Sequence, residues 1–159
     1  MEAGVRLANH IKRTVTGPMW HGPALGDLLA GVTPEQAAAR PIEEAHSIWE
    51  ITLHTIAWAE IARARMRGER MDDPTAEEDW PPVRATSAEA WAAVVERVRQ
   101  SHRELAADIR HLSGEQMQEK IGTLDYSVSN LLHGVIEHST YHGGQIALLK
   151  KALGAGSKS

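Results

Sequence analysis

The stretch VSNLLHGVIEHSTYHGGQIALL, residues 128–149, has the repeat of an amphipathic helix. Apolar residues recur on one of its faces at helical spacing, at Val128, Leu131, Val135 and Leu149. Ser127 stands where a capping hydroxyl is needed, and Leu153-Gly154 follows the last periodic residue. The pattern predicts one long helix between these two points.

Three further segments have helical periodicity. Residues 3–16 form the first, which Gly17-Pro18 ends. We expect the next to start near Pro41, with Glu43 and Glu44 in its first turn, where the helix dipole favours them. Its stripe reads Ser47, Ile51, His54, Trp58 and Ile61, and an arginine run at 63–67, interpreted as a solvated last turn, precedes Gly68. The last segment opens at the capping-box signature of residues 86–89 and stops at Ser113-Gly114.

The connecting segments are rich in proline. Residues 18–41 are predicted to hold short turns and small helices, among them a capped turn at Thr33-Pro34-Glu35-Gln36. Residues 72–84 carry three prolines and are predicted to be a loop. Four long amphipathic segments joined in this way predict an all-α fold, with a four-helix bundle as its architecture.

Composition narrows the class of protein. The 159 residues suit one domain, predicted at 1–153 with a flexible tail at 154–159. A formal net charge of -4 argues against broad binding to nucleic acid or to anionic membranes. The sequence shows neither an apolar run of membrane-spanning length nor a secretory signal pattern, so a cytoplasmic location is expected. Because cysteine is absent, disulfides, thiolate metal sites and cysteine nucleophiles are excluded.

Histidine is abundant, with nine residues, and three of those that stand on apolar faces are the strongest candidates. His138 and His142 are four positions apart, so their side chains share one side of the helix. His54 lies between Ile51 and Trp58 on the stripe of its own segment. A single such histidine is more often a hydrogen-bonded core residue than a ligand. Two side by side need partners for both rings, which makes a metal site and a packed pair about equally probable from spacing alone.

The remaining histidines are weaker candidates. His102 is on the inward stripe of the segment after residue 86 and is either a further ligand or, more simply, a packed, hydrogen-bonded residue. His46 is near a helix start, and His133 points away from His138. Surface or cap positions are expected for His10, His21 and His111.

Several sharper motifs are missing. His138 is not followed by glutamate, so the segment is not the zinc-protease motif H-E-x-x-H. Di-iron bundles need Glu-x-x-His on two helices, and only residues 43–46 fit. Neither a G-x-S-x-G elbow nor a Walker loop is present.

Two motifs together resemble those of the DinB-like (YfiT-like) metalloenzymes. Residues 132–146, LHGVIEHSTYHGGQI, look like the family's signature, and residues 46–58, HSIWEITLHTIAW, are similar to its second-helix motif. The resemblance covers essentially the whole chain, including Trp20-His21-Gly22-Pro23. It implies a four-helix bundle with an up-down-down-up course, a divalent metal held by His54, His138 and His142, and homodimers.

The resemblance also implies classes of chemistry. Some members are S-transferases that use low-molecular-weight thiols such as bacillithiol or mycothiol, and a related branch isomerises maleylpyruvate with a thiol cofactor. Three neutral imidazoles leave a four-coordinate ion, zinc or nickel, with one open position for water or for a thiol. The expected function is therefore metal-dependent thiol transfer to a small-molecule substrate. The alternatives are hydrolysis by a metal-activated water and a non-catalytic, metal-stabilised binding or stress protein.

Five neighbours of the expected ligands are also of interest. Tyr141 and Gln145 flank the histidines and are expected to help position a bound group. Glu50, one turn before His54, is the expected acceptor for the second nitrogen of that ring. Gly143-Gly144 is costly inside a helix, which indicates either close helix approach or a tolerated defect.

Overall fold

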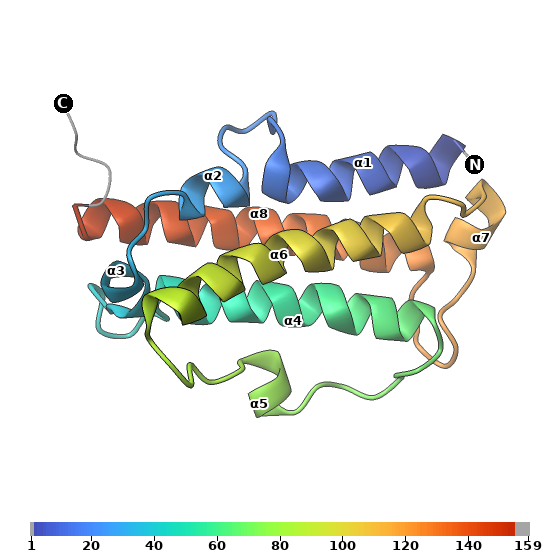
Figure 1. Ribbon diagram of the computed structural model, residues 1–159. Coiled ribbons are helices and arrows are strands. Elements are labelled where there is room, and N and C mark those ends of the chain that lie inside the picture. Colours follow the sequence, from blue (N-terminus) through green and yellow to red (C-terminus); the bar gives the residue numbers. More distant parts are fainter. Residues whose placement is uncertain (1, 155–159) are drawn as a thin grey trace.

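The computed structural model describes residues 2–154, and over this range the chain is all-α, with eight helices and no strand (Figure 1). Four helices are long: α1 (Glu2–Thr16), α4 (Ile48–Met66), α6 (Ala88–Ile109) and α8 (Val128–Ala152). Four are short: α2 (Leu25–Leu29), α3 (Pro34–Ala38), α5 (Ala76–Asp79) and α7 (Gly114–Gln118). The all-α prediction is confirmed. Of the predicted tail at 154–159, everything after Gly154 lies outside the described residues.

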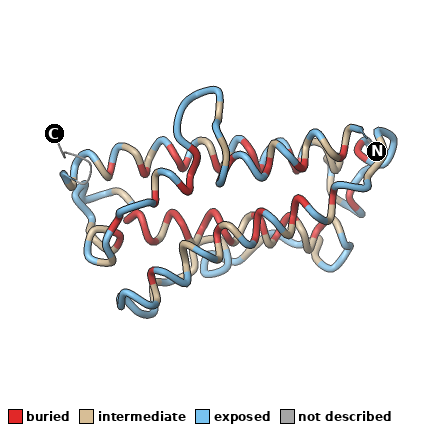
Figure 2. The backbone as a smooth tube through the Cα atoms, turned by 45° about the horizontal axis from the view of Figure 1, so that its top comes forward, coloured by how far each residue is buried: buried red, intermediate tan, exposed pale blue. Residues whose placement is uncertain are grey.

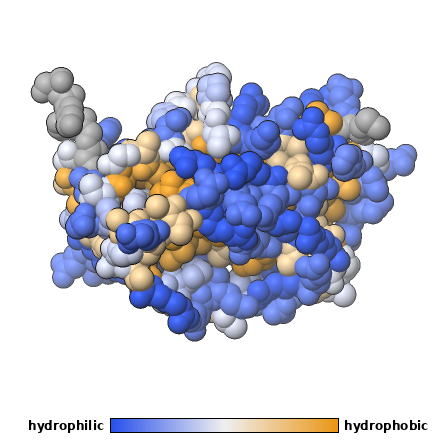
Figure 3. Space-filling view, in the orientation of Figure 1, coloured by the Kyte–Doolittle hydropathy of each residue, from blue (hydrophilic) through white to orange (hydrophobic). Residues whose placement is uncertain are grey.

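The four long helices lie side by side (Figure 1). Helices α1 and α8 run in one direction, and α4 and α6 run in the opposite direction. Helix α6 packs against α1 and α4, and α8 packs against the same two helices from the other side. In Figure 2 the buried turns of the long helices face the space that they enclose. On the face shown in Figure 3, hydrophilic residues cover the central part, and an apolar area lies toward the end that carries α2 and α3.

The core consists of two apolar clusters. One contains Trp49 and Trp91, and the indole nitrogen of Trp91 donates to the Val32 carbonyl at 2.8 Å. The other contains Leu105 and Leu132. Between the clusters, α6 and α8 carry the buried polar side chains Ser101, His102, Ser139 and His142, and α4 adds the buried His54 and Thr55. Together with the half-buried His138, this polar layer carries the histidines that the sequence singled out. None of the described helices is long and apolar enough to span a membrane.

The predicted start of the second long helix near Pro41 is wrong. Helix α4 begins at Ile48, because Ser47 and Glu50 form a capping box. The Glu50 amide donates to Ser47 Oγ at 3.2 Å, and the Ser47 amide donates to Glu50 Oε2 at 2.7 Å. Glu43 and Glu44 are therefore exposed residues before the helix, and Ser47 is its cap rather than part of its apolar stripe.

Other predicted boundaries hold only in part. The loop predicted at 72–84 contains α5, capped by Thr75. Helix α6 is capped by Ser87, whose Oγ accepts from the amide of Ala90, so the predicted pairing of Thr86 with Glu89 is wrong. Helix α6 ends at Ile109 rather than at Ser113-Gly114, since Ser113 caps α7. The capped turn at 33–36, the Ser127 cap and the helix end at Leu153-Gly154 are confirmed.

The arginine run at the end of α4 is not a solvated turn. Arg63 bonds Glu104 and Asp108 of α6, so it joins two packed helices. Arg65 is only 4% exposed. Only Arg67, which pairs with Asp108 at 2.9 Å, is largely exposed. The prediction failed because the last turn of α4 is covered by α6 and by the segment before α8.

Candidate metal centre

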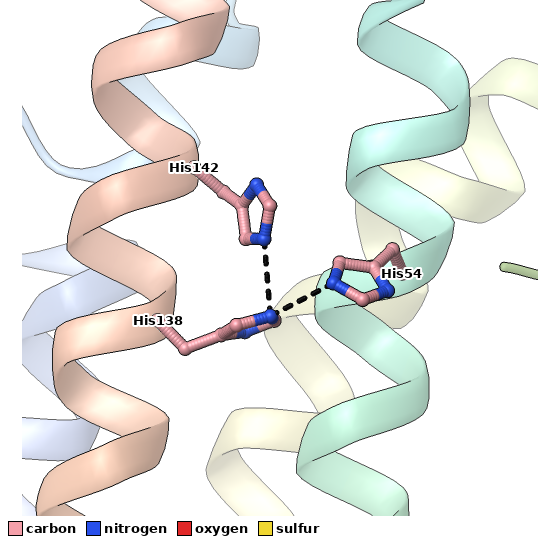
Figure 4. Close-up of side chains that lie close together, drawn as sticks. All are labelled: His54, His138 and His142. Atoms are coloured by element: carbon pink, nitrogen blue, oxygen red, sulfur yellow. Dashed lines mark hydrogen bonds between the residues drawn. The ribbon is translucent and has the colours of Figure 1, made fainter. Parts of the chain in front are cut away.

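The structure brings three of the predicted histidines together. His54 comes from α4, and His138 and His142 come from α8 (Figure 4). His138 Nε2 lies 2.9 Å from His54 Nε2 and 3.0 Å from His142 Nε2. One ligand atom from each ring lies within 4.8 Å of the others. His54 and His142 are buried, and His138 is half-buried, so the three nitrogens meet inside the helical assembly.

The outer nitrogens fix the protonation of two rings. His54 Nδ1 lies 2.6 Å from the Asp79 carbonyl oxygen, and His142 Nδ1 lies 2.6 Å from Gln145 Oε1. Because an oxygen acceptor requires a proton on Nδ1, the Nε2 atom of each neutral ring carries a lone pair. Both lone pairs face His138 Nε2, which has at most one proton to donate. The three rings therefore cannot satisfy one another, whereas a shared cation would satisfy all three.

Two of the three separations between the ring nitrogens are close to those of a metal site, and all three ligand atoms lie within 4.8 Å of one another. Zinc–nitrogen bonds of about 2.0–2.1 Å in a tetrahedral site place the nitrogens about 3.3 Å apart. The two short separations, 2.9 and 3.0 Å, are within a few tenths of an ångström of that spacing. The donor set therefore fits a divalent ion with one position open to another ligand.

Burial keeps all three rings neutral. It lowers the pKa of His138 to about 3, with a further contribution from the neighbouring imidazoles of His142 and His54. Burial also lowers the pKa of His54, against the opposing effect of the Asp79 carbonyl, and that of His142, against the opposing effect of Gln145. Since only neutral imidazole binds a metal, these rings are in the binding form at neutral pH.

Asp79 and Trp80, which the sequence did not suggest, are also part of the site. The Asp79 carboxylate accepts from the Trp58 indole nitrogen at 2.7 Å while its carbonyl accepts from His54. The ring of Trp80 stacks on His54 with 3.8 Å between centroids, and His46 stacks at 3.6 Å from Trp80. The capping box at Thr75 could have revealed helix α5, but no local pattern shows that its end reaches His54.

The prediction that Glu50 accepts a hydrogen bond from the His54 ring is wrong. Its carboxylate caps α4 through Ser47 and pairs with Arg40, so the His54 ring is held by Asp79 instead. The Glu50 side chain is engaged in the capping box at the start of α4, so it does not accept from the His54 ring.

The other sequence candidates have these positions. Gln145 contacts His142, and its Nε2 donates to the Tyr141 hydroxyl at 3.1 Å; the Tyr141 side chain is exposed. His102 lies outside the cluster, buried between Ser139 Oγ at 3.1 Å and the Val98 carbonyl at 2.9 Å. His10 is half-buried, while His21, His111 and His133 are exposed.

Gly143 and Gly144 differ in their surroundings. A Cβ at Gly143 would meet Leu28 of α2 at 3.4 Å, whereas a Cβ at Gly144 would meet nothing within 4 Å. Contact at 3.4 Å with the end of a leucine side chain is ordinary packing, so nothing in the structure explains either glycine.

The family comparison agrees with this geometry. The model of the DinB superfamily matches residues 20–146, a range that contains all three clustered histidines and the segment with Asp79 and Trp80. No curated protein and no solved structure matches the chain. The family match covers well over half of the chain, so the chain belongs to the DinB superfamily.

Proposed function

We propose that the chain is a metal-dependent enzyme that transfers a low-molecular-weight thiol to an electrophilic substrate. In this proposal His54, His138 and His142 hold one divalent ion, zinc or nickel. The observation that carries it is the convergence of three neutral imidazoles whose lone pairs have no sufficient proton donor among them. When bound, the ion supplies a positive charge that lowers the pKa of a thiol or water in its open position.

The surroundings of the histidines favour a thiol over water as the nucleophile. Among the described residues, no carboxylate belongs to the cluster of three rings, and the Asp79 carboxylate lies 3.3 Å from the outer nitrogen of His54. Asp79 bonds Trp58 on the outer side of His54, and Glu50 caps α4. Hydrolysis by activated water usually needs a general base, whereas a coordinated thiol has already lost its proton. The chain has no cysteine, so the thiol comes from a separate molecule.

The chain's own residues then hold and shield the reacting groups. The Asp79 carbonyl and the Gln145 amide oxygen fix the orientation of the His54 and His142 rings. Trp80 covers one face of His54 and limits the access of water there. Tyr141, bonded to Gln145, is a candidate for contact with a bound group.

We also propose the finer architecture that the resemblance implies. The opposite directions of α1 and α8 relative to α4 and α6, and the packing of each long helix on two others, support an up-down-down-up four-helix bundle within one domain, residues 1–153. Homodimers are part of the same proposal.

A thiol-consumption assay tests the proposed reaction. Zinc-loaded protein is mixed with cysteine, bacillithiol or mycothiol and with chlorodinitrobenzene, and the loss of free thiol is followed. A carbon–sulfur bond forms, chloride leaves, and the thiol proton passes to solvent. We expect turnover above the uncatalysed rate that needs a thiol and disappears in His138→Ala.

The control is His133→Ala, which changes an exposed histidine on the same helix and should keep full turnover. Equal turnover in His138→Ala would reject the proposal. Ester hydrolysis without any thiol would favour the hydrolase, and a metal-loaded protein inactive across thiols and electrophiles would favour a non-catalytic role.

A further inference from the structure

A cavity of about 440 Å³ lies beside His138, between α4 and α8. We call it the His138 groove. Its lining is mostly apolar and includes Trp58, Leu131 and Val135, with the His138 ring at one end. The Trp58 and His138 rings are 5.9 Å apart, so the groove begins at the metal centre. A molecule lying in it would contact His138, one of the three proposed ligands.

The groove is elongated along the two helices. Trp58 and Arg65 line it from α4, seven residues apart, and His138 and Leu131 line it from α8, also seven apart. At a rise of 1.5 Å per residue, the backbones of each pair lie about 10 Å apart along their helix. The Arg65 guanidinium carbon lies 5.7 Å from the centre of the Trp58 ring. Because the helices run in opposite directions, Arg65 lies at the end away from His138, where it bonds Tyr126.

The far end has more hydrogen-bond donors than acceptors. Arg65 is 4% exposed and presents five N–H groups. Its partners are the Tyr126 hydroxyl at 2.7 Å, the Asp72 carbonyl at 3.1 Å and the Asp73 carboxylate at 3.3 Å. Within residues 2–154, its Nε has no partner although it is buried. The Asp73 side chain is almost fully exposed, so solvent weakens its pairing with the guanidinium.

Tyr126 connects the buried Arg65 to the groove and is itself a hydrogen-bond donor there. Its hydroxyl oxygen accepts from Arg65, and its own proton remains available to a group in the groove, which Tyr126 lines. Asn130, which also lines this end, can donate from its amide. A ligand group that accepts hydrogen bonds and carries negative charge suits this end; an ammonium group does not.

We propose that the His138 groove binds a slender, largely apolar substrate whose end far from the histidines is a carboxylate. This inference rests on the proposed function for the role of the metal end, and it names the substrate class of that site. The carboxylate lies at Tyr126 and Arg65, the chain lies along Leu131 and Val135, and the reacting carbon lies near His138.

Gly134 provides a means to block the groove. It lines the cavity, and a Cβ built there meets nothing within 4 Å, so a larger side chain would enter the empty space rather than the core. Gly144, on the same helix, also has open space around its Cβ position but is exposed and does not line the groove. Gly134→Leu and Gly144→Leu are therefore a matched pair.

Calorimetric titration of the zinc-loaded full chain with octanoate and with octylammonium tests the inference. We expect octanoate to bind and octylammonium to bind at least about ten-fold more weakly, because the charged end meets donors. Gly134→Leu should abolish octanoate binding, and Gly144→Leu should preserve it. Equal binding of the two probes, or octanoate binding that survives Gly134→Leu, would overturn the inference.

Tyr126→Phe tests the orientation. Removing the hydroxyl while keeping the ring should lower octanoate affinity about ten-fold. Unchanged affinity would mean that the carboxylate binds elsewhere, such as at the metal, and would overturn the proposed orientation and substrate class. Zinc content is measured on each sample. If the protein binds zinc but not octanoate, the inference about the groove is contradicted and the proposed function is not. If it binds octanoate but no zinc, the proposed function is contradicted and the inference about the groove is not.

Discussion

Four buried or half-buried histidines lie in the polar layer of this protein, and their ring nitrogens distinguish them. Both nitrogens of His102 have oxygen partners, Ser139 Oγ and the Val98 carbonyl. His54, His138 and His142 instead turn one nitrogen each toward a common point. In the sequence all four look alike, as polar residues on apolar faces. Only the partners of the ring nitrogens separate a packed histidine from candidate ligands.

The buried His102 should make stability depend on pH. Burial lowers its pKa from the usual 6.5 to about 4, against the opposing effect of the Val98 carbonyl. Below about pH 6.5 the His102 ring binds a proton in the unfolded chain but not in the folded protein. The free energy of unfolding therefore decreases as the pH falls, until the pH reaches the pKa of the folded protein. Between about pH 7.5 and pH 5 this loss amounts to about 2 kcal/mol.

Urea unfolding of metal-free protein and of His102→Gln at both pH values measures this effect. The other histidines are common to both proteins, so their contributions cancel. We expect the free energy of unfolding to fall by about 2 kcal/mol more in the wild type than in the variant between the two pH values. Identical losses would show that His102 is not held neutral by burial.

Gln145 should act on the metal through His142. Its Oε1 accepts from His142 Nδ1 at 2.6 Å and so fixes the ring that would bind the ion through Nε2. Removal of such an outer partner typically lowers metal affinity about 10–100-fold. Zinc competition against a chelating dye should show this loss in Gln145→Ala and none in Gln118→Ala, an exposed glutamine on α7. Equal zinc affinity in the two variants would rule out a positioning role.

At the scale of helices, the sequence predicts type better than boundaries. The periodic stripes identify all four long helices, because apolar spacing reflects which face is buried. The start of α4 was misplaced by seven residues, from 41 to 48, because Pro41 and two acidic residues also resemble a helix start. Helix α5 was missed because its four residues contribute no apolar stripe, and its role comes from tertiary contacts of Asp79 and Trp80.

Two helical glycines should respond in opposite ways to alanine. A Cβ at Gly26 of α2 would lie 2.5 Å from the Val15 carbonyl oxygen of α1, so the two backbones would have to separate. We expect Gly26→Ala to lower the free energy of unfolding by about 1–3 kcal/mol. Gly144 of α8 has open space, so Gly144→Ala should raise it by about 0.5–1 kcal/mol.

Chemical denaturation of the two variants beside the wild type measures both effects. Since each change is glycine to alanine within a helix, helix propensity is common to both, and the difference isolates the close contact. Destabilisation of the same size in both variants would contradict this explanation.

In the whole molecule, the polar layer lies between two apolar clusters. The sequence could predict that His54, His138 and His142 face inward, because each stands on an apolar stripe. It could not predict that Asp79 and Gln145 hold the outer nitrogens, or that Arg65 is buried at the end of a groove. These features depend on which helices are neighbours, and this is set by packing rather than by periodicity within one segment.

The most direct test of the account is elemental analysis of the purified full chain after incubation with zinc and removal of the excess. The wild type and His133→Ala are compared with a triple variant, His54→Ala, His138→Ala and His142→Ala, and circular dichroism verifies that each is helical. The account predicts about one zinc per chain in the first two proteins and almost none in the folded triple variant. A triple variant that retains the metal, or a wild type that binds none, would contradict it.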